Sequence, residues 1–341
     1  MLIVGIGDLL IPSSYIEEGF KTFKENDYKL KLINWDLKDY EELQHINLLV
    51  EQNGAEVYEV KEDIIEAIKD ADIIITQFHP ITKKLIDNCP NLKIVGVLRG
   101  GVENINLDYC NEKGIKVFNT PGRNGNAVAD FTVGMILCEL RNIARGHKTL
   151  KEGLWVKEYS NKDYVFDLCD KTIGIVGYGA IGKKVAQRLK AFDANIIVYD
   201  PYYQNDDVKK VELKELFKQA DIVTIHSRLT KENEKMINYE LLSSMKKSAY
   251  FINTARSGLV DEDALDKVLK DKMIAGAAID VFEEEPPGKD YKFIKYDNVT
   301  ITPHMAGTSK DAFTYSPVLL AKDMYEELIN NKKSNNVINR R

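Results

Sequence analysis

TIGIVGYGAIGK, residues 172–183, carries the strongest structural signal in this 341-residue chain. Its first five residues form an apolar, β-branched run that is typical of a buried strand. Beyond the glycines, apolar residues recur at the spacing of one helix face, at Ile181, Val185, Leu189 and Phe192. The stretch therefore predicts a strand, a glycine turn and a helix in succession, the first part of a βαβ unit.

The glycines of this stretch follow the spacing GxGxxG, and each has a mechanical role. Gly177 permits a tight turn, Gly179 lets a ligand approach the backbone, and Gly182 lets the helix pack closely on the strand. The helix N-terminus offers free N–H groups and the positive end of its dipole to a pyrophosphate. Asp200, which lies 18 residues after Gly182 at the end of the next predicted strand, can accept hydrogen bonds from ribose hydroxyls.

This arrangement predicts a dinucleotide site, with a fortuitous glycine cluster and an S-adenosylmethionine site as the alternatives. The full run of predicted strands favours the dinucleotide. Asp200 would repel a 2′-phosphate, and no arginine follows it within residues 201–207, so NAD is preferred over NADP. The earlier Gly5-Ile6-Gly7 lacks a third glycine. The expected cofactor contacts are Gly177, Gly179, Ala180, Ile181, Gly182 and Asp200.

Short β-rich runs alternate with helical patterns along the chain, which predicts an α/β fold with parallel sheets. In the first third, strands are expected at Leu2–Gly5, Ile73–Thr76, Ile94–Leu98 and Val117–Asn119. Later strands are expected at Thr172–Val176, Ile196–Tyr199, Asp221–His226, Ala249–Asn253, Ile274–Ile279 and Asn298–Thr302. A helix over Ala127–Leu140 is apolar nearly all round, so burial between domains or subunits is expected. A final helix over about Val318–Asn330 is expected to pack on the first domain.

Composition limits the class of protein. The length suggests two domains, and 44% hydrophobic with 29% charged residues is ordinary for a globular enzyme. A net charge of −6 argues against nucleic acid as a partner. The four cysteines form no CxxC pair, which speaks against a metal site or disulfides and favours a reducing compartment. With neither a signal-peptide pattern nor an apolar run long enough to span a bilayer, a cytoplasmic protein without a membrane partner is expected.

Hydride transfer between a nicotinamide and a carbonyl carbon needs a proton donor and a group that holds the anionic substrate. Histidine suits the first role near neutral pH, and the arginine fork matches a carboxylate. Three segments that follow predicted strands offer such groups: NTARSG at 253–258, DVFEEEP at 280–286 and TPHMAG at 302–307. Open α/β sheets bind ligands at the C-terminal ends of their strands, so these segments are the candidate site.

Taken together, the motifs resemble those of the D-isomer-specific 2-hydroxyacid dehydrogenases, the family that includes D-3-phosphoglycerate dehydrogenase. The resemblance runs over nearly the whole chain. Besides the glycine turn and the three strand-end segments, it rests on RGGVEN at 99–104, NTPG at 119–122, AVAD at 127–130 and IHSRLT at 225–230.

This resemblance implies a role for particular residues. His304 would be the general acid/base, Glu285 its carboxylate partner, and Arg256 the group that binds the substrate carboxylate and carbonyl. Asp280 and the backbone of Thr254 and Ala255 would contact the nicotinamide carboxamide. Further cofactor contacts are expected at His226 and Ala306, and substrate contacts at Gln77, His79, Gly100, Gly101 and Asn124.

The resemblance also implies a discontinuous domain arrangement. A flavodoxin-like substrate domain of residues 1–121 and 303–341 would contain an inserted Rossmann NAD-binding domain of residues 122–302. The two domains would act as a clamp whose closure excludes water. The helix at 127–140 would lie in a homodimer interface. The implied activity is the NAD-dependent interconversion of a small D-2-hydroxy acid and its 2-keto acid.

The chain departs from the phosphoglycerate dehydrogenase pattern mainly in its first domain. The loop TQFHPIT at 76–82 lacks the arginine that those enzymes place there for phosphate. Arg99 and Arg123 are less usual, and either is a candidate to bind a different anionic substrate. Ser257 stands where glycine is usual, and Arg228 where proline is common. The sequence therefore leaves the identity of the substrate open.

Other interpretations compete with this one. NAD(H)-sensing proteins that resemble the C-terminal-binding-protein corepressors share the fold and these residues, but the lack of long disordered tails or a basic patch favours an enzyme. Formate dehydrogenases generally have glutamine at the position of Glu285, which lowers that option. Structural roles are the simpler alternative for single residues: a core or capping role for His304, a surface ion pair for Arg256 and a solvated loop for Glu283–Glu285.

Overall fold

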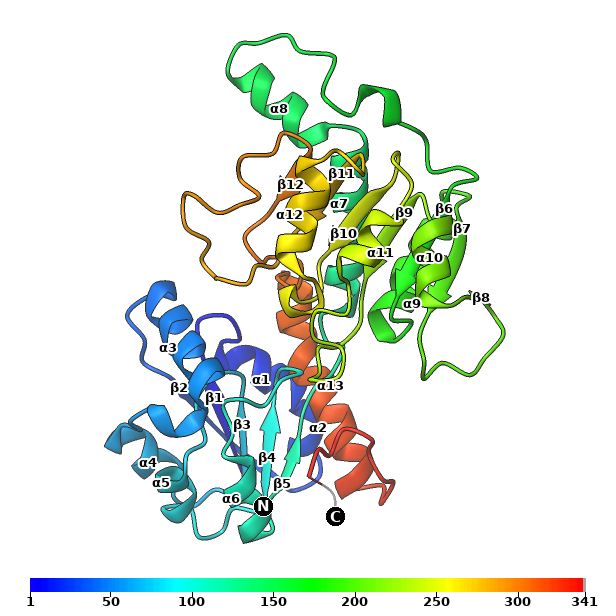
Figure 1. Ribbon diagram of the computed structural model, residues 1–341. Coiled ribbons are helices and arrows are strands. Elements are labelled where there is room, and N and C mark those ends of the chain that lie inside the picture. The colour runs from blue at the N-terminus through cyan, green and yellow to red at the C-terminus, as the bar shows by residue number, and fades with distance from the viewer. Residues whose placement is uncertain (340–341) are drawn as a thin grey trace. The chain divides into compact units, whose positions relative to one another are not determined.

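The structure is a computed structural model, and it describes residues 1–339. The chain divides into two compact units, each with one parallel sheet covered by helices (Figure 1). The first unit consists of Met1–Asn124 and the C-terminal segment that begins at Ser309, and the second consists of Gly125–Thr308. Both divisions fall a few residues later in the chain than the boundaries expected after residues 121 and 302.

The first unit is built on a five-stranded parallel sheet in the order β2-β1-β3-β4-β5. The strands are β1 (Leu2–Gly7), β2 (Lys29–Asn34), β3 (Ile73–Thr76), β4 (Ile94–Val97) and β5 (Lys116–Phe118). The strands β3 and β4 are buried throughout, as expected for a parallel sheet with helices on both faces. This strand order is flavodoxin-like, so that part of the fold prediction is confirmed.

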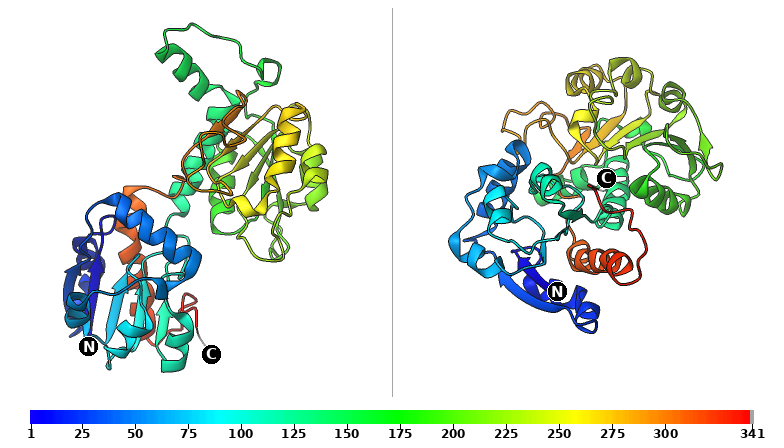
Figure 2. Two further views of the ribbon diagram at one scale, coloured as in Figure 1. Left: turned by 60° about the vertical axis from the view of Figure 1, so that its left-hand side comes forward. Right: turned by 90° about the horizontal axis from the view of Figure 1, so that it is seen from below.

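Two groups of helices cover the faces of this sheet. One face packs against α1 (Ser13–Gly19), α2 (Lys21–Lys24) and α13 (Lys310–Leu328), and the other against α3 (Tyr40–Asn53), α4 (Glu62–Ile68), α5 (Lys83–Asp87) and α6 (Leu107–Lys113). The left view of Figure 2 shows α13, in orange and red, among the blue and cyan elements of this unit. The contact with α1 is close, because a Cβ on Gly19 would lie 2.6 Å from Pro317.

The second unit contains a seven-stranded parallel sheet in the order β12-β11-β10-β9-β6-β7-β8. The strands are β6 (Thr172–Val176), β7 (Asn195–Tyr199), β8 (Lys209–Lys210), β9 (Ile222–Ile225), β10 (Tyr250–Asn253), β11 (Gly276–Ile279) and β12 (Val299–Ile301). The order reverses between β6 and β9, at the switch point where doubly wound sheets bind nucleotides. The predicted Rossmann-type fold is confirmed.

The helices of the second unit also form two layers. On one face lie α7 (Gly125–Leu140) and α9 (Ala180–Lys190), and on the other α10 (Leu213–Gln219), α11 (Tyr239–Ser243) and α12 (Glu262–Lys270). Because α7 packs on α9 and on β10, β11 and β12, its sequence is apolar nearly all round. None of the residues of α8 (Ile143–Lys151) is buried, and this helix and the segment after it extend away from the sheet (Figure 1).

Three elements differ from the sequence-based prediction for physical reasons. β2 and β8 lie at the edges of their sheets, where exposed residues such as Lys209 and Lys210 weaken the apolar pattern of a strand. The last helix begins at Lys310 instead of near Val318, and Pro317 lies inside it. Pro317 is buried against α1, so packing offsets the hydrogen bond that a proline cannot donate.

The parallel strands bring their carboxyl ends to one edge of each sheet. In the second unit that edge carries the glycine turn after β6 and the loops after β10, β11 and β12, which contain Arg256, Glu285 and His304. Across residues 1–339, no helix combines the length and the apolar character that crossing a membrane would require.

Candidate active site

The glycine turn joins β6 to α9. Gly177 has a φ of 92°, which L side chains rarely adopt, and a Cβ there would lie 2.6 Å from Ser227 N. A Cβ on Gly182 would lie 2.1 Å from Gly177 O, so the close packing of helix on strand requires glycine at this position. Gly179, which precedes the helix, has open space where a Cβ would point, and no side chain caps the first turn of α9. The N–H groups of Ala180 and Ile181 therefore belong to an uncapped helix start.

Asp200 follows β7, beside this turn. Its Oδ2 accepts a hydrogen bond from Tyr178 N at 2.8 Å, and its Oδ1 accepts one from Tyr202 N at 2.9 Å. Each oxygen keeps a second lone pair for a ribose hydroxyl. His226 follows β9, and its Nε2 lies 3.0 Å from Thr224 Oγ1. Burial lowers the pKa of His226 to about 3, so its ring is neutral.

His304 and Glu285 form a hydrogen-bonded pair. The Nδ1 atom of His304 lies 2.7 Å from Glu285 Oε2, and Glu285 Oε1 accepts a hydrogen bond from Phe282 N at 3.0 Å. Both carboxylate oxygens are thus held in place. The imidazole side chain is 45% exposed, so Nε2 is available to an incoming molecule.

The two groups shift each other's pKa. The hydrogen bond to Glu285 raises the pKa of His304 above its ordinary value, against the effects of burial and of the Arg256 charge. Burial would raise the pKa of Glu285, but the bonds from His304 and from Phe282 N–H hold it below its ordinary value. The geometry therefore favours an imidazolium beside a carboxylate, which suits a general acid.

The loop that carries His304 is held by the buried carboxylate of Asp280. Its Oδ1 accepts hydrogen bonds from Thr302 Oγ1 at 2.6 Å and from Met305 N at 3.0 Å, and its Oδ2 accepts one from Ala306 N at 2.8 Å. These bonds fix the loop on both sides of His304, whose φ of 47° is uncommon for a residue with a side chain. Contacts of Asp280 and Ala306 with the nicotinamide carboxamide or the cofactor stay predictions.

Arg256 lies exposed at the end of β10. Its Nη1 donates to Ala255 O at 2.7 Å, and Asn253 holds the loop, because its Nδ2 donates to Arg256 O at 3.1 Å and its Oδ1 accepts from Ala255 N at 3.0 Å. The charge of Arg256 affects the pKa of both Glu285 and His304. The structure thus brings together the three residues that the sequence suggested for catalysis.

The expected substrate contacts all lie in the first unit. They are Gln77 and His79 after β3, Gly100 and Gly101 after β4, and Asn124 at the end of the first segment. The His79 ring is buried, with centroids 5.0 Å from Trp35 and 5.6 Å from Tyr58, and burial lowers its pKa to about 4. Asn119 Nδ2 donates to Gly100 O at 2.6 Å and fixes that loop. Contact of these residues with substrate stays a prediction.

Family profiles match the chain in both units. The D-isomer specific 2-hydroxyacid dehydrogenase, NAD binding domain, matches residues 133–306, and the catalytic domain of the same family matches residues 36–192. The chain belongs to this family. The sequence-based predictions of a 2-hydroxyacid dehydrogenase and of NAD as its cofactor are therefore confirmed.

Relatives within the family span several activities. The chain is 37% identical over 286 residues to a D-3-phosphoglycerate dehydrogenase of Methanocaldococcus jannaschii, covering 82% of this chain and 54% of that protein. It is 39% identical over 273 residues to a glyoxylate reductase of Thermofilum pendens, covering 77% and 80%. The chain thus spans about half the length of the D-3-phosphoglycerate dehydrogenase. The NAD complex of a D-isomer specific 2-hydroxyacid dehydrogenase from Lactobacillus delbrueckii ssp. bulgaricus has a TM-score of 0.78 and 25% identity, covering 99% of this chain and 100% of that one.

The residues of this dehydrogenase fit NAD at the glycine turn. The open space at Gly179 and the uncapped start of α9 suit a pyrophosphate, and the carboxylate of Asp200 suits an unphosphorylated ribose. The backbone of Thr254 and Ala255 is expected to contact the nicotinamide carboxamide. The Thr254 hydroxyl is held by a hydrogen bond with Thr132 Oγ1 at 2.7 Å. The fit of the turn thus agrees with the family assignment.

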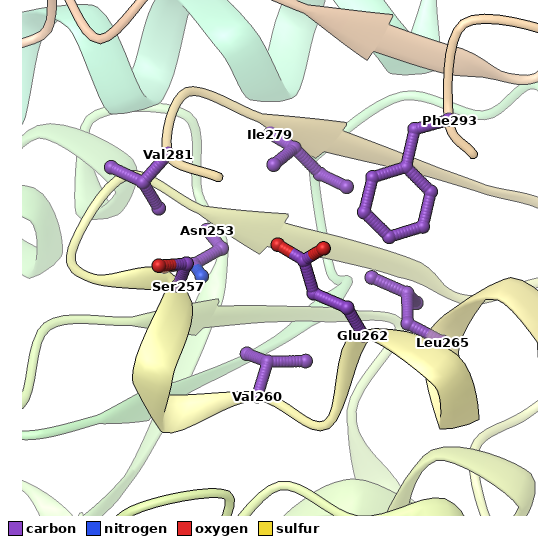
Figure 3. A pocket seen from close by; sticks show the side chains of 8 residues that line it. All are labelled: Asn253, Ser257, Val260, Glu262, Leu265, Ile279, Val281 and Phe293. Carbon is purple, nitrogen blue, oxygen red and sulfur yellow. The ribbon is translucent and has the colours of Figure 1, made fainter. Parts of the chain in front are cut away.

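Sequence reasoning missed Glu262, which holds the loop after β11, the loop that contains Glu285, by a hydrogen bond. Figure 3 shows its carboxylate in a small pocket that Asn253 and Ser257 also line. Glu262 Oε1 accepts a hydrogen bond from Glu283 N at 3.0 Å, and Oε2 accepts one from the Tyr291 hydroxyl. The side chain is only 3% exposed, and burial raises its pKa. In the sequence, Glu262 resembles any acidic residue in the first turn of a helix, so no local signal distinguishes it.

Proposed function

We propose that this chain interconverts a small 2-keto acid and the matching D-2-hydroxy acid, with His304 as the general acid/base. The observation that carries the proposal is the 2.7 Å contact between His304 Nδ1 and Glu285 Oε2, next to the charge of Arg256. When bound, NADH supplies the hydride. The family assignment and the relatives named glyoxylate reductase and hydroxypyruvate reductase support this reaction class.

Each catalytic residue has a separate task in the proposed reduction. His304 donates the proton on Nε2 to the keto oxygen, because its Nδ1 is held by Glu285. Glu285 stabilises the imidazolium and fixes the ring orientation. Arg256 binds the substrate carboxylate and polarises the carbonyl through its fork of N–H donors. In the oxidation, the same His304 nitrogen accepts the hydroxyl proton.

The test of this function is turnover. The purified chain is mixed with NADH and a panel of 2-keto acids that includes glyoxylate, pyruvate and hydroxypyruvate, and the loss of NADH absorbance is followed. Chiral analysis of the product is expected to give the D isomer. A protein that binds NADH tightly, turns over none of the panel and binds a partner protein in an NADH-dependent manner would instead support the NAD(H)-sensing alternative.

The pH dependence of reduction is expected to depend on Glu285. Reduction needs a protonated His304, and the hydrogen bond to Glu285 raises the pKa of that group above its ordinary value of 6.5. The rate of reduction should therefore persist above pH 6.5 and fall at higher pH. Replacing Glu285→Gln removes the main cause of the raised pKa, so the falling limb of kcat/KM should move to lower pH. A limb that does not move in the variant would exclude His304 as the titrating acid.

We propose further that two copies of the chain associate through α8, the segment after it and α7. In this region Trp155 is 77% exposed, Leu150 58% and Leu154 53%, which is unusual for large apolar residues on a monomer surface. Phe131 and Leu137 of α7 are only partly buried and extend the apolar surface. The expected homodimer would cover these side chains.

Replacing Trp155→Lys is expected to convert the homodimer into a monomer, because a charge in a buried apolar contact is poorly compensated. Light scattering after size-exclusion chromatography measures the mass directly. Tyr202→Lys is a matched control, because Tyr202 is an aromatic residue that is 89% exposed outside this region. A wild-type chain that runs at the monomer mass would contradict the proposed dimer.

A further inference from the structure

The carboxyl edge of the five-stranded sheet in the first unit gathers four polar residues. Asp8 directly follows β1, and Gln77 directly follows β3, next to it in the sheet, where Ile6 pairs with Thr76. The adjacent strand β4 is continued to Arg99, whose carbonyl oxygen accepts a hydrogen bond from Thr120 N at 3.0 Å. Arg123 lies one turn further on, since its N–H donates to Thr120 O at 3.4 Å. Backbone hydrogen bonds therefore hold this cluster together.

Two of these side chains are buried with unsatisfied polar atoms. Gln77 is fully buried, and within residues 1–339 neither its Nε2 nor its Oε1 has a hydrogen-bond partner. Asp8 is 7% exposed, and its Oδ1 accepts hydrogen bonds from Leu10 N and Ile11 N at 2.9 Å, while its Oδ2 has no partner in the same residues. Buried polar groups are paired in most native proteins, so these atoms are free to bind an incoming polar group.

The two arginines of the cluster differ in how their charges are neutralised. Arg99 Nη2 forms ion pairs with Glu51 at 2.6 Å and with Glu103 at 3.3 Å, and its guanidinium lies 5.1 Å from the centroid of the Phe78 ring. Arg99 therefore joins α3 to the end of β4. The positive charge of Arg99 is already neutralised by these two carboxylates, so Arg99 should bind a further anion only weakly.

Arg123 forms no such ion pair within residues 1–339, and the acidic side chain that acts on its charge is Asp8. Its polar side-chain contact is a hydrogen bond from Nη1 to Ala312 O at 3.4 Å, and its guanidinium lies 5.4 Å from the centroid of the Phe313 ring. No carboxylate among residues 1–339 forms an ion pair with it. Burial and the nearby charge of Arg99 lower its pKa to about 10, yet it remains a cation at neutral pH. Its remaining N–H donors can bind an anion in a bidentate manner.

We propose that Arg123 and the Gln77 amide bind a second anionic group of the substrate, a carboxylate or a phosphate remote from the reacting carbonyl. This inference rests on the proposed 2-keto acid reduction and names the class of substrate for it. The anion would be held by the Arg123 fork, by the N–H donors of Gln77 and by a protonated Asp8 Oδ2. A monoanionic keto acid with an apolar tail would leave the Gln77 amide, Asp8 Oδ2 and the remaining Arg123 donors unpaired.

Asp8 gives this subsite a dependence on pH. Burial raises the pKa of Asp8 to about 6, against the hydrogen bonds from Leu10 N and Ile11 N. The charged side chain that acts on it is Arg123, and the other contacts are backbone N–H groups, including that of Phe78. A bound anion raises the pKa of Asp8 further, so binding takes up a proton. Affinity for the second anionic group should therefore fall as the pH rises above about 6.

The test compares substrates that differ only in the remote group. One pair is 2-ketoglutarate and 2-ketopentanoate, and another is phosphohydroxypyruvate and hydroxypyruvate, which distinguishes carboxylate from phosphate. For at least one pair, the wild-type kcat/KM should be about 10- to 100-fold higher for the substrate with two anionic groups, the usual effect of a charge-assisted hydrogen bond. This ratio cancels contributions from His304, which both members of a pair share.

Variants then assign the ratio to residues. Arg123→Gln should reduce the ratio to near one, and Arg123→Lys should restore only part of it, because lysine keeps the charge without the fork. Arg99→Gln is the matched control and should keep the wild-type ratio, because its charge is already paired with Glu51 and Glu103. For the 2-ketoglutarate pair, whose remote carboxylate does not titrate in this range, Asp8→Asn should remove the dependence of the ratio on pH between about 5 and 8, the range around the raised pKa of Asp8.

The outcomes separate this inference from the proposed function. Turnover of both members of each pair with a ratio near one would overturn the inference and leave the reductase intact. The same holds for a ratio that Arg99→Gln abolishes and Arg123→Gln does not. If no keto acid is turned over, the reductase proposal fails, and thermal stabilisation by 2-ketoglutarate compared with 2-ketopentanoate still tests the anion subsite. Stabilisation by the dicarboxylate that Arg123→Gln removes would support the subsite, and equal stabilisation would refute it.

Discussion

Replacing His304→Ala should lower kcat for keto-acid reduction by about 100- to 10,000-fold, the usual contribution of a general acid. The imidazole is the group whose proton reaches the keto oxygen in the proposed mechanism, and Glu285 is placed to charge it. Because the ring is 45% exposed at the surface of a loop, its loss leaves little cavity and the fold should be kept. Steady-state kinetics at saturating NADH measure the effect.

Two controls make the His304 result interpretable. The affinity for NADH, followed by fluorescence, should be nearly unchanged in the variant, because the glycine turn and Asp200 are untouched. His45→Ala removes a histidine that is exposed on α3 of the other unit, and its kcat should match the wild type. An unchanged kcat for His304→Ala would refute the proposed acid and leave its position next to Glu285 as a structural contact.

Replacing Arg256→Gln should lower kcat/KM by about 100-fold, because the substrate carboxylate loses a bidentate, charge-assisted contact. Arg256→Lys should recover only part of this loss, since an ammonium group matches the two carboxylate oxygens poorly. Arg256→Gln also removes a positive charge that lowers the pKa of His304, so the falling pH limb of reduction should move to higher pH in that variant. A structural role alone would not produce this pH shift.

The matched control for Arg256 is Arg228→Gln. Arg228 is an exposed arginine that follows a neighbouring strand of the same sheet, and its charge does not contribute to the pKa shifts of His304 and Glu285. Equal losses of kcat/KM in the two variants would indicate a general effect of surface charge on substrate association. A loss confined to Arg256 would identify the carboxylate-binding residue.

Local patterns predicted most of the second unit, because the residues that define its motifs lie close together in the sequence. The glycine turn, the strand before it and the helix after it lie within residues 172–190, so spacing alone specifies them. His304 and Glu285 are 19 residues apart, and their pairing followed from the family resemblance, not from spacing. The edge strand β2 was missed although lysine and leucine alternate in its first four residues, and the edge strand β8 was missed because it consists of two exposed lysines.

Residues that act through long-range contacts had no sequence signal. Glu262 and Tyr291 are separated by 29 residues, and only the folded loop brings them together. Likewise Arg99 and Arg123 are equivalent candidates in the sequence, and the difference between them appears only when Glu51 is folded against Arg99. Pro317 gave a misleading signal, because its burial against α1 outweighs its tendency to end a helix.

The discontinuity of the first unit has a consequence for how the chain folds during synthesis. All five of its strands precede the second unit in the chain, but α13, which buries Leu320 and Met324 against the same cluster as Phe20 and Phe23, follows it. The part of that face that α13 covers therefore stays open to water until the second unit has been synthesised. The second unit is continuous and can finish first, so the usual N-to-C order of domain completion is reversed. Until then, the nascent chain should depend on chaperones that shield the apolar residues that α13 later covers.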